Sequence, residues 1–369
     1  MKMNPFYYGG AVDQEHFCNR VNEIKELSSD ILSGLNVLIY APRRFGKTSF
    51  VLKTLDALKT EDVKYVFLDL MYLSTQEEFI NKYFNVLAKS LEEPTDKVIN
   101  FFKSVLKIRP NINVSFDQTG SSSFSLALGG EDKTKVLEEV LNIPLYYANA
   151  GQKIVIVFDE FQEIASLDLE AKLRSVIQMH SNKLSYIFMG SKKSLLHQMF
   201  LDKSRPFYKS VKHLKIQEIQ KDAWLKFITT KFASTNKTIT EDIIDSILEI
   251  TKGFPYYTQQ FAYEMWHLTQ ESVSGEIFAA TLKTIMAREE DLFALEWDNL
   301  TANQKKAIKI ILQKEGKNLY DEQYLARYAI KSGSLQTALK GLLEKDIIDK
   351  TADGVYFQDP LFEFWINNS

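Results

Sequence analysis

The stretch "NVLIYAPRRFGKTSFVL", residues 36–52, decides the fold. It begins with "NVLIY", an apolar run of the length of a buried strand, and "KTSFVLKTLDAL" is expected to form the next helix. Between them, "APRRFGKT", residues 41–48, follows the phosphate-binding loop pattern G-x-x-x-x-G-K-[ST], except that Ala41 stands at the first glycine. A strand, a glycine-containing loop and a helix in this order predict a P-loop fold.

The residue types of this loop predict how it contacts a nucleotide. Backbone N–H groups that turn inward form a concave anion site, and the start of the next helix favours the β-phosphate. Lys47 is expected to reach the β- and γ-phosphates, and the Thr48 hydroxyl to coordinate Mg²⁺. Gly46 lets the backbone approach the phosphates, and Ser49 is placed to touch the α-phosphate. The predicted contacts with ATP or ADP are Ala41, Pro42, Arg43, Arg44, Phe45, Gly46, Lys47, Thr48 and Ser49.

Two features of the loop leave alternatives open. Alanine at position 41 is tolerable if its φ is negative, whereas a positive φ would cost about 1–2 kcal/mol and weaken binding. Arg43 and Arg44 either contact phosphate or pair with acids such as Glu163.

A second acidic motif supports hydrolysis. The segment "KIVIVFDEFQEI", residues 153–164, is a nearly continuous apolar strand that ends in Asp159 and Glu160. In this position Asp159 is expected to order the Mg²⁺ shell and Glu160 to polarise the attacking water. The alternative is that both acids merely cap the end of a strand. Because loop and acids occur in the expected order on the expected elements, we favour hydrolysis over nucleotide storage.

Composition limits the class of protein. The 369 residues are 45% hydrophobic and 25% charged, which is typical of soluble globular domains. The net charge of −3 gives no global attraction to nucleic acid, and a single cysteine, Cys18, excludes a disulfide framework. The N-terminus has no apolar signal core, and no run approaches the ~20 apolar residues that span a bilayer. We therefore expect a cytoplasmic protein without a membrane partner.

The order of elements predicts an α/β fold in three domains. Apolar strands that alternate with helices indicate a parallel sheet covered on both faces, within a P-loop ATPase core over residues 1–217. Residues 95–135 are an insertion that contains a β-hairpin. Helical segments follow in a lid over residues 218–299. Three helices and a hairpin over residues 300–369 have the order of a winged helix-turn-helix.

The partner of the winged helix is left open. Its recognition helix is expected near residues 334–345, where Gln336, Lys340 and Lys345 are candidate contacts to duplex DNA. Residues 301–369 contain ten Lys or Arg and nine Asp or Glu, so the net charge is only +1. A strong DNA-binding footprint would be more basic. The alternatives are a protein-interaction module and an autoinhibitory module of the same fold.

The motifs "FCNRVNEI", "APRRFGKTS", "FDEFQEI", "FMGS" and "GFPYYTQQ" occur in this order. Together with the terminal "FQDPLFEFWI", they resemble the archaeal-type ATPases, in the STAND-related branch of the AAA+ ATPases. The resemblance extends over almost the whole chain. It implies an ATP-hydrolysing molecular switch whose C-terminal domain is a winged helix.

The resemblance also implies roles outside the loop. Phe17 and Arg20 match a box that contacts the adenine side of the nucleotide, although Asn19 replaces the glycine of that box. Ser191 matches a polar sensor near the γ-phosphate. Gly253 and Pro255 match the G-x-P motif of the lid, and the alternative is a plain helix break. Arg205 is either an arginine finger for a neighbouring subunit or a solvated surface arginine.

Two functions from different classes remain. The first is an ATPase switch, in which ATP binding holds lid and winged helix in one arrangement and hydrolysis releases them. The second is a nucleotide-gated DNA-binding regulator in which turnover is incidental. A structural scaffold is a third and weaker alternative. Self-association or a protein partner is compatible with each of them.

Overall fold

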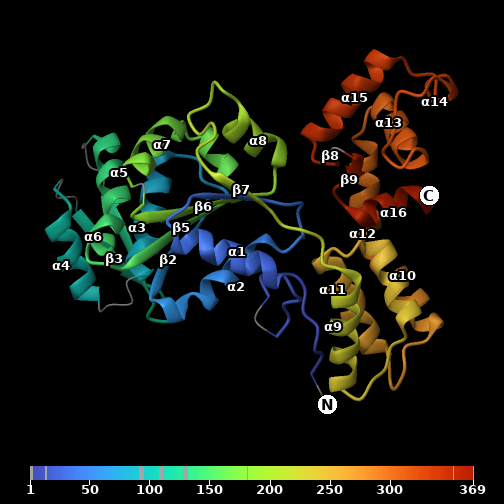
Figure 1. Cartoon of the computed structure of the whole chain (residues 1–369), viewed down its shortest axis with the longest axis horizontal. Helices are drawn as coiled ribbons and strands as arrows, with labels where there is room; N and C mark the ends of the chain where they lie inside the picture. The colour runs from blue at the N-terminus through green and yellow to red at the C-terminus, as the bar shows by residue number, and fades with distance from the viewer. Residues whose placement is uncertain are drawn as a thin grey trace. The chain divides into compact units, whose positions relative to one another are not determined.

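The computed structural model describes residues 3–12, 15–90, 95–107, 111–127, 132–180, 182–351 and 353–368. Figure 1 shows its helices and strands in chain order. The chain forms two compact units. The sheet unit comprises Arg20–Ala41 and Phe50–Ile216, and the lid unit comprises Met1–Asn19, Pro42–Ser49 and Gln217–Ser369. The phosphate loop therefore belongs to the lid unit. The division into three domains at residues 217 and 299 stays a prediction.

The sheet unit is built on five parallel strands in the order β2-β5-β6-β1-β7. The strands are β1 (Val37–Tyr40), β2 (Val63–Asp69), β5 (Lys153–Asp159), β6 (Leu184–Gly190) and β7 (Lys212–Lys215). Every pairing between neighbours in this sheet is parallel, which confirms the predicted α/β fold class. Since the strands are parallel, their carboxyl ends share one edge of the sheet, where ligands bind in open α/β sheets.

Helices and a hairpin accompany this sheet. They are α1 (Val21–Leu32), α2 (Lys47–Ala57), α3 (Gln76–Ser90), α4 (Thr95–Val105), α5 (Lys133–Asn142), α6 (Pro144–Asn149), α7 (Glu170–Met179) and α8 (Lys193–Leu201), with 3₁₀ turns η1 (Lys59–Glu61) and η2 (Phe161–Ala165). Thr75 caps α3, because the Glu78 N–H donates to Thr75 Oγ1 at 3.1 Å. A helix over residues 95–105 was not predicted.

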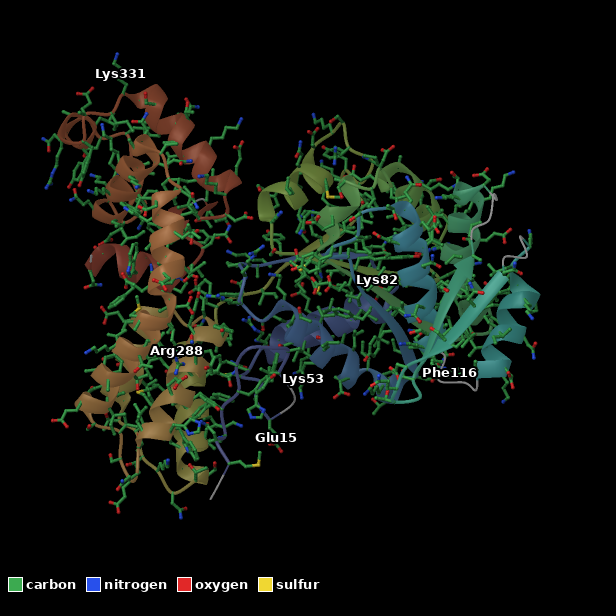
Figure 2. All side chains as sticks on the ribbon, turned by 180° about the vertical axis from the view of Figure 1, so that it is seen from behind. Glu15, Lys53, Lys82, Phe116, Arg288 and Lys331 are labelled. Carbon is green, nitrogen blue, oxygen red and sulfur yellow. The ribbon has the colours of Figure 1, made fainter. Side chains whose placement is uncertain are left out.

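The predicted hairpin consists of β3 (Asn111–Phe116) and β4 (Ser122–Ala127). Its inner strand binds helix α3 through two amide side chains. The N–H of Phe124 donates to Asn85 at 2.9 Å, and the N–H of Leu126 donates to Asn81 at 2.7 Å. Phe116 lies at the exposed end of the hairpin (Figure 2). The insertion is therefore fixed to the sheet unit through α3.

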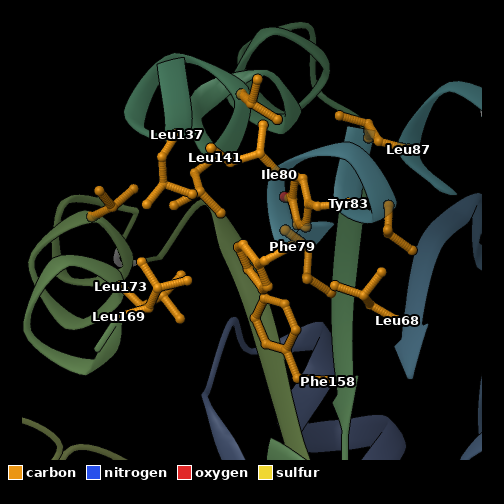
Figure 3. Close-up of a cluster of buried hydrophobic side chains, with 14 of the residues drawn as sticks. Leu68, Phe79, Ile80, Tyr83, Leu87, Leu137, Leu141, Phe158, Leu169 and Leu173 are labelled. Carbon is orange, nitrogen blue, oxygen red and sulfur yellow. The ribbon is translucent and has the colours of Figure 1, made fainter. Parts of the chain in front are cut away.

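The core of the sheet unit is rich in aromatic side chains. Figure 3 shows Phe79, Tyr83 and Phe158 among leucine side chains. All residues of β6 are buried, as expected for a central strand between two helical layers. Phe158 of β5 is fully buried and lies 6.1 Å from the rings of both Tyr186 and Phe188. These contacts assign the aromatic side chains of this core to packing. They also fix the strand that ends in Asp159.

The lid unit contains the helices α9 (Lys221–Ser234), α10 (Glu241–Thr251), α11 (Pro255–Leu268) and α12 (Gly275–Asp298). The N-terminal segment packs against them: the ring of Phe6 lies 5.3 Å from that of Phe232, and Asn4 donates to the carbonyl of Tyr263 at 3.0 Å. The predicted helical lid is present, although the length of α12 was not predicted. No helix within the described ranges is both long and apolar enough to cross a membrane.

The C-terminal part has the predicted winged-helix order. It consists of α13 (Ala302–Gln313), α14 (Glu322–Arg327), α15 (Ser332–Glu344), β8 (Ile348–Thr351), β9 (Gly354–Phe357) and α16 (Pro360–Asn368). Neither Ser332 nor Ser334 caps the recognition helix. Helix α15 begins after Lys331 and has no side-chain cap. Gly316 has a φ of 74°, and its backbone accepts a hydrogen bond from the Val355 N–H of the wing at 3.0 Å.

Candidate nucleotide-binding site

The phosphate loop joins β1 to α2, as the sequence predicts. Arg44 and Gly46 have φ values of 62° and 83°, whereas the residue between them has a negative φ. Alternation of this kind turns consecutive N–H groups into a concave anion site. Ala41 is not among the residues with positive φ. The missing first glycine therefore introduces no backbone strain at that turn.

The side chains of the loop lie close to its own backbone. The Lys47 ammonium donates to the carbonyl of Pro42 at 3.0 Å, and Lys47 is only 8% exposed. The Ser49 hydroxyl is also buried and accepts a hydrogen bond from the N–H of Val12 at 3.0 Å. Thr48 is partly exposed at the first turn of α2. The predicted phosphate contacts of Lys47 and Ser49 and the metal contact of Thr48 stay predictions.

The lid packs directly onto this loop through the G-F-P stretch before α11. The rings of Phe45 and Phe254 meet edge to face at 5.0 Å, and the N–H of Tyr256 donates to the carbonyl of Arg44 at 3.4 Å. A Cβ added to Gly46 would lie 3.9 Å from Pro255 Cγ. Gly253 has a φ of 67°, so glycine suits this position. The stretch is thus more than a helix break, because it holds the phosphate loop.

Arg44 extends from the loop to the C-terminal domain. Its guanidinium donates to the Tyr257 hydroxyl and lies 3.3 Å from Asp359 Oδ2, while Tyr257 also donates to Asp359. The Tyr256 ring lies 5.0 Å from the guanidinium carbon. Burial, reinforced by Asp359, raises the pKa of Tyr257, so the phenol stays protonated and donates. Of the expected alternatives, pairing with an acid is therefore present, and the acid is Asp359 rather than Glu163.

The helix after Asp359 is bound to the lid at further points. Lys252, beside the G-F-P stretch, pairs with Glu363 of α16. The ring of Phe362 lies 5.4 Å from that of Phe293 in α12, and the Trp365 indole donates to Glu290 at 3.0 Å. The terminal aromatic segment therefore packs the winged helix onto the lid.

The N-terminal box has the backbone that its replaced glycine requires. Asn19 and Arg20 have φ values of 58° and 71°, and asparagine is among the residues that tolerate this region. Phe17 and Asn19 line a cleft of about 700 Å³ against helix α9, where Ala223 and Phe227 form the opposite wall. Arg20 is buried in the sheet unit, 3.8 Å from Glu23. The predicted adenine contacts of Phe17 and Arg20 stay predictions.

The sheet unit brings the predicted acids and the predicted sensor together. Asp159 ends β5, and Ser191 follows β6, the next strand in the sheet. The Ser191 hydroxyl donates to Glu160 Oε2 at 3.0 Å. Glu160 has a φ of 51°, an uncommon conformation for a residue of this type. Such outliers cluster at functional sites, where the surrounding contacts hold them in place.

Two further acids, Asp69 and Glu170, are partners of predicted site residues. Asp69 ends β2 and is the register partner of Asp159, so a second carboxylate lies at the same sheet edge. Asp69 was not predicted as a site residue, although "FLDL" also ends an apolar strand in an acid. Arg205 donates to Glu170, which is 8% exposed, within the sheet unit. A role for Arg205 toward a neighbouring subunit stays a prediction.

Comparisons with known proteins agree with the fold. The family described as an ATPase domain predominantly from Archaea matches residues 17–261, and a probable winged helix domain matches residues 291–368. A comparison with curated proteins found no match.

Solved structures of the same fold extend over nearly the whole chain. A Walker-type ATPase of Pyrococcus abyssi is 19% identical, with 96% of this chain and 97% of that chain covered and a TM-score of 0.67. The ORC2 protein of Aeropyrum pernix, solved as ADPNP–ADP complexes, is 13% identical with 96% of each chain covered and a TM-score of 0.56. At these identities the likeness concerns the fold. The family match spans more than half of the sequence, and the chain therefore belongs to the family of ATPase domains found predominantly in Archaea, with a C-terminal winged helix domain.

Proposed function

We propose that this protein is an ATP-hydrolysing molecular switch of the AAA+/STAND type, in which the nucleotide state controls the C-terminal winged helix. The contact between Arg44 and Asp359 is the observation that carries this proposal. It joins a residue of the phosphate loop to the turn that follows the wing. Any movement of the loop on binding or losing a phosphate would therefore change a contact of the C-terminal domain.

Nucleotide binding is assigned to the loop and the lid. The N–H groups from Arg44 to Thr48 and the Lys47 ammonium would hold the β- and γ-phosphates. Ser49 would approach the α-phosphate. The cleft beside Phe17 has the size of small-molecule sites, and we place the nucleobase at its edge, with Arg20 and the Gly253–Pro255 turn as further contacts.

Hydrolysis is assigned to the acids at the ends of the strands. The fit of Mg²⁺ rests on the chemistry of the donors, since Thr48 and Asp159 supply the oxygen ligands that this ion prefers. Within the described ranges no group of three or more His, Cys, Asp or Glu side chains could hold a metal ion by itself. Phosphate oxygens would complete the shell, and Mg²⁺ when bound neutralises charge between the phosphates. Glu160 would orient the attacking water, and Ser191 would contact the γ-phosphate.

The coupling must come from a difference in contacts between two states. Arg44 and Asp359 are 34% and 32% exposed, so solvent screens their attraction. A pair of this kind contributes on the order of 1 kcal/mol, which corresponds to about a fivefold change in an equilibrium. The pair therefore favours one position of the winged helix, and the other contacts of α16 contribute the rest of the stabilisation of that position.

Steady-state phosphate release tests the hydrolysis. The wild type should release phosphate from Mg²⁺–ATP, and Glu160→Gln should bind ATP with similar affinity but release phosphate at least about 100-fold more slowly, as expected for loss of a general base. Lys47→Ala should lose nucleotide affinity. Equal and negligible rates in the wild type and in Glu160→Gln would remove the ATPase assignment. Unchanged affinity in Lys47→Ala would favour a scaffold.

A nucleotide-gated DNA-binding regulator is the second candidate, and the exposed face of α15 favours it. Gln336, Thr337 and Lys340 are exposed there beside a groove of about 810 Å³. Lys345 is less available, because it donates to the carbonyl of Asn299 at 2.8 Å. Duplex DNA should then bind in one nucleotide state more tightly than in another, and Lys340→Gln should reduce the salt slope by about one. Absence of salt-sensitive binding in every state would exclude this function and leave a protein partner or self-association.

A further inference from the structure

Gln162 lies two residues after Glu160, in the 3₁₀ turn η2, and is only 4% exposed. Its amide nitrogen donates to Glu160 Oε2 and lies 3.5 Å from Glu163 Oε1. Its amide oxygen is buried and has no hydrogen-bond partner within the described residues. A buried amide therefore uses its donor on Glu160 while its acceptor stays unpaired.

Three donors converge on one oxygen of Glu160. Besides Gln162, the Ser191 hydroxyl donates to Oε2 at 3.0 Å, and the Ser191 N–H lies 3.4 Å from the same atom. Among the described residues, nothing donates to the other oxygen, Oε1. The carboxylate is thus held by one oxygen, and the second oxygen is available to a water molecule. The left-handed backbone of Glu160 adds a further restraint on its direction.

A packing role alone does not account for Gln162. An unpaired buried acceptor costs about 1–3 kcal/mol, and an apolar side chain of the same size would avoid that cost. The neighbouring strand is also adapted to this amide. A Cβ at Gly190 would lie 2.2 Å from Gln162 Oε1, so only glycine leaves room for the side chain in this position. Since most buried polar groups have a hydrogen-bond partner, an unpaired one calls for an explanation, and a functional role is one.

We infer that Gln162 is a positioning residue, which together with Ser191 fixes Glu160 so that its Oε1 can accept a proton from the attacking water. Gly190 is the part of this arrangement that makes room for the amide. The inference rests on the proposed hydrolysis of ATP. A displacement of a catalytic group by about 1 Å can reduce the rate 100-fold, so the amide has a measurable effect without touching the nucleotide.

Gln162→Met separates a positioning role from a structural one. Methionine keeps the length of the side chain and removes both the donor and the unpaired acceptor. We expect kcat to fall by about 10- to 100-fold, while the Kd for ATP and the thermal midpoint stay close to those of the wild type. A fall in thermal midpoint together with a loss of ATP affinity would indicate a structural role and would overturn the inference.

Gln162→Glu tests the same contact through pH. A second carboxylate beside Glu160 disfavours ionisation of the pair, so the acidic limb of the kcat–pH profile should move up by about one unit or more. A profile that coincides with that of the wild type would contradict direct contact. In the Glu160→Gln background, Gln162→Met should cause no further loss, because the group that it positions is already absent.

Gly190→Ala approaches the amide from the other side. The added methyl has to displace Gln162, so kcat should fall as in Gln162→Met although Gly190 has no side chain to contact ATP. The double variant Gly190→Ala/Gln162→Ala should be no slower than Gln162→Ala alone, since the clash is then relieved. Additive losses of kcat in the double variant would show that Gly190→Ala acts through a contact other than the one with Gln162.

The outcomes separate this inference from the proposed function. If the wild type releases no more phosphate than Glu160→Gln, the ATPase assignment fails first. If the wild type hydrolyses ATP and Gln162→Met retains its kcat, the ATPase assignment stands and the role of Gln162 is wrong.

Discussion

The guanidinium of Arg44 lies 3.3 Å from the carboxylate of Asp359, and the hydroxyl of Tyr257 contacts both groups. One residue of the phosphate loop is thus bound to the turn after the wing and to the lid helix between them. A nearby carboxyl belongs to the same electrostatic group. The pKa of the Glu296 carboxyl is raised, chiefly by burial and also by the charge of Asp359. The charge of Arg44 partly offsets this increase.

Removing the Arg44 charge should loosen the C-terminal helix. In Arg44→Met and in Asp359→Asn we expect the backbone amides of α16 to exchange hydrogen about fivefold faster, which corresponds to the ~1 kcal/mol of a partly exposed pair. The double variant should exchange no faster than either single variant. Arg43→Met is the matched control, because Arg43 is an exposed neighbour in the same loop. Unchanged exchange in both single variants would show that the pair does not hold α16.

Ala41 and Gly46 should respond in opposite ways to substitution. Ala41→Gly should change ATP affinity less than about threefold and lower stability by about 0.4–1 kcal/mol, because glycine adds freedom to the unfolded chain. Gly46→Ala should lose stability and most nucleotide affinity, since its φ of 83° strains any side chain. Isothermal titration with ATP and thermal unfolding measure both effects. A large gain of affinity in Ala41→Gly would mean that the turn at Ala41 is strained.

The fold and the approximate positions of the predicted site residues followed from local patterns. Apolar strands ending at the loop, at Asp159 and before Ser191 are visible in the sequence, because a parallel sheet buries both faces and leaves its polar groups at the strand ends. The helix over residues 95–105 was missed. The residues Val98 and Phe102 that it buries do recur at helical spacing, so the pattern was present in the sequence.

The contacts between distant segments could not be predicted in this way. Arg44 and Asp359 are separated by 315 positions, and nothing in the local sequence pairs them. The same holds for Gln162 and Gly190, whose fit depends on the register of β5 with β6. Arg44 was expected to contact phosphate or to pair with acids such as Glu163, and the position of α16 on the lid brings Asp359 to it instead.

Two glycines of the winged helix provide a matched pair. A Cβ at Gly316 would lie 1.8 Å from the Val355 carbonyl oxygen, so Gly316→Ala should separate the wing from its support and lower stability by more than about 2 kcal/mol. Gly333, in the first turn of α15, has nothing within 4 Å of its Cβ position, and alanine there should stabilise the helix by up to about 1 kcal/mol. Chemical unfolding followed by tryptophan fluorescence compares them. Equal effects would contradict the packing of the wing.

The buried His180 should make stability depend on pH. Its ring lies between the Tyr186 hydroxyl at 2.6 Å and Asn142 at 2.7 Å, and burial lowers its pKa from 6.5 to about 4. As the pH falls, His180 therefore takes up a proton in the unfolded chain before it does so in the folded chain. The contribution of His180 to stability is fully present above pH 6.5 and is lost as the pH decreases toward 4. The loss attributable to His180 is about 3 kcal/mol. His180→Gln should have a shallower decrease over this range, and parallel curves would contradict the assignment.

The distance between the winged helix and the lid tests the central claim most directly. Spin labels at Gln336→Cys in α15 and Ala279→Cys in α12, both exposed, can be placed in a Cys18→Ser background. Pulsed electron–electron double resonance would then measure the distance between the two labels in the nucleotide-free protein, in the ADP complex and in Glu160→Gln with Mg²⁺–ATP. For a nucleotide-controlled switch, we expect the distance distribution with ATP to differ from that with ADP, and Arg44→Met to reduce the difference. Identical distributions in all three states, with nucleotide binding verified, would contradict a nucleotide-controlled switch.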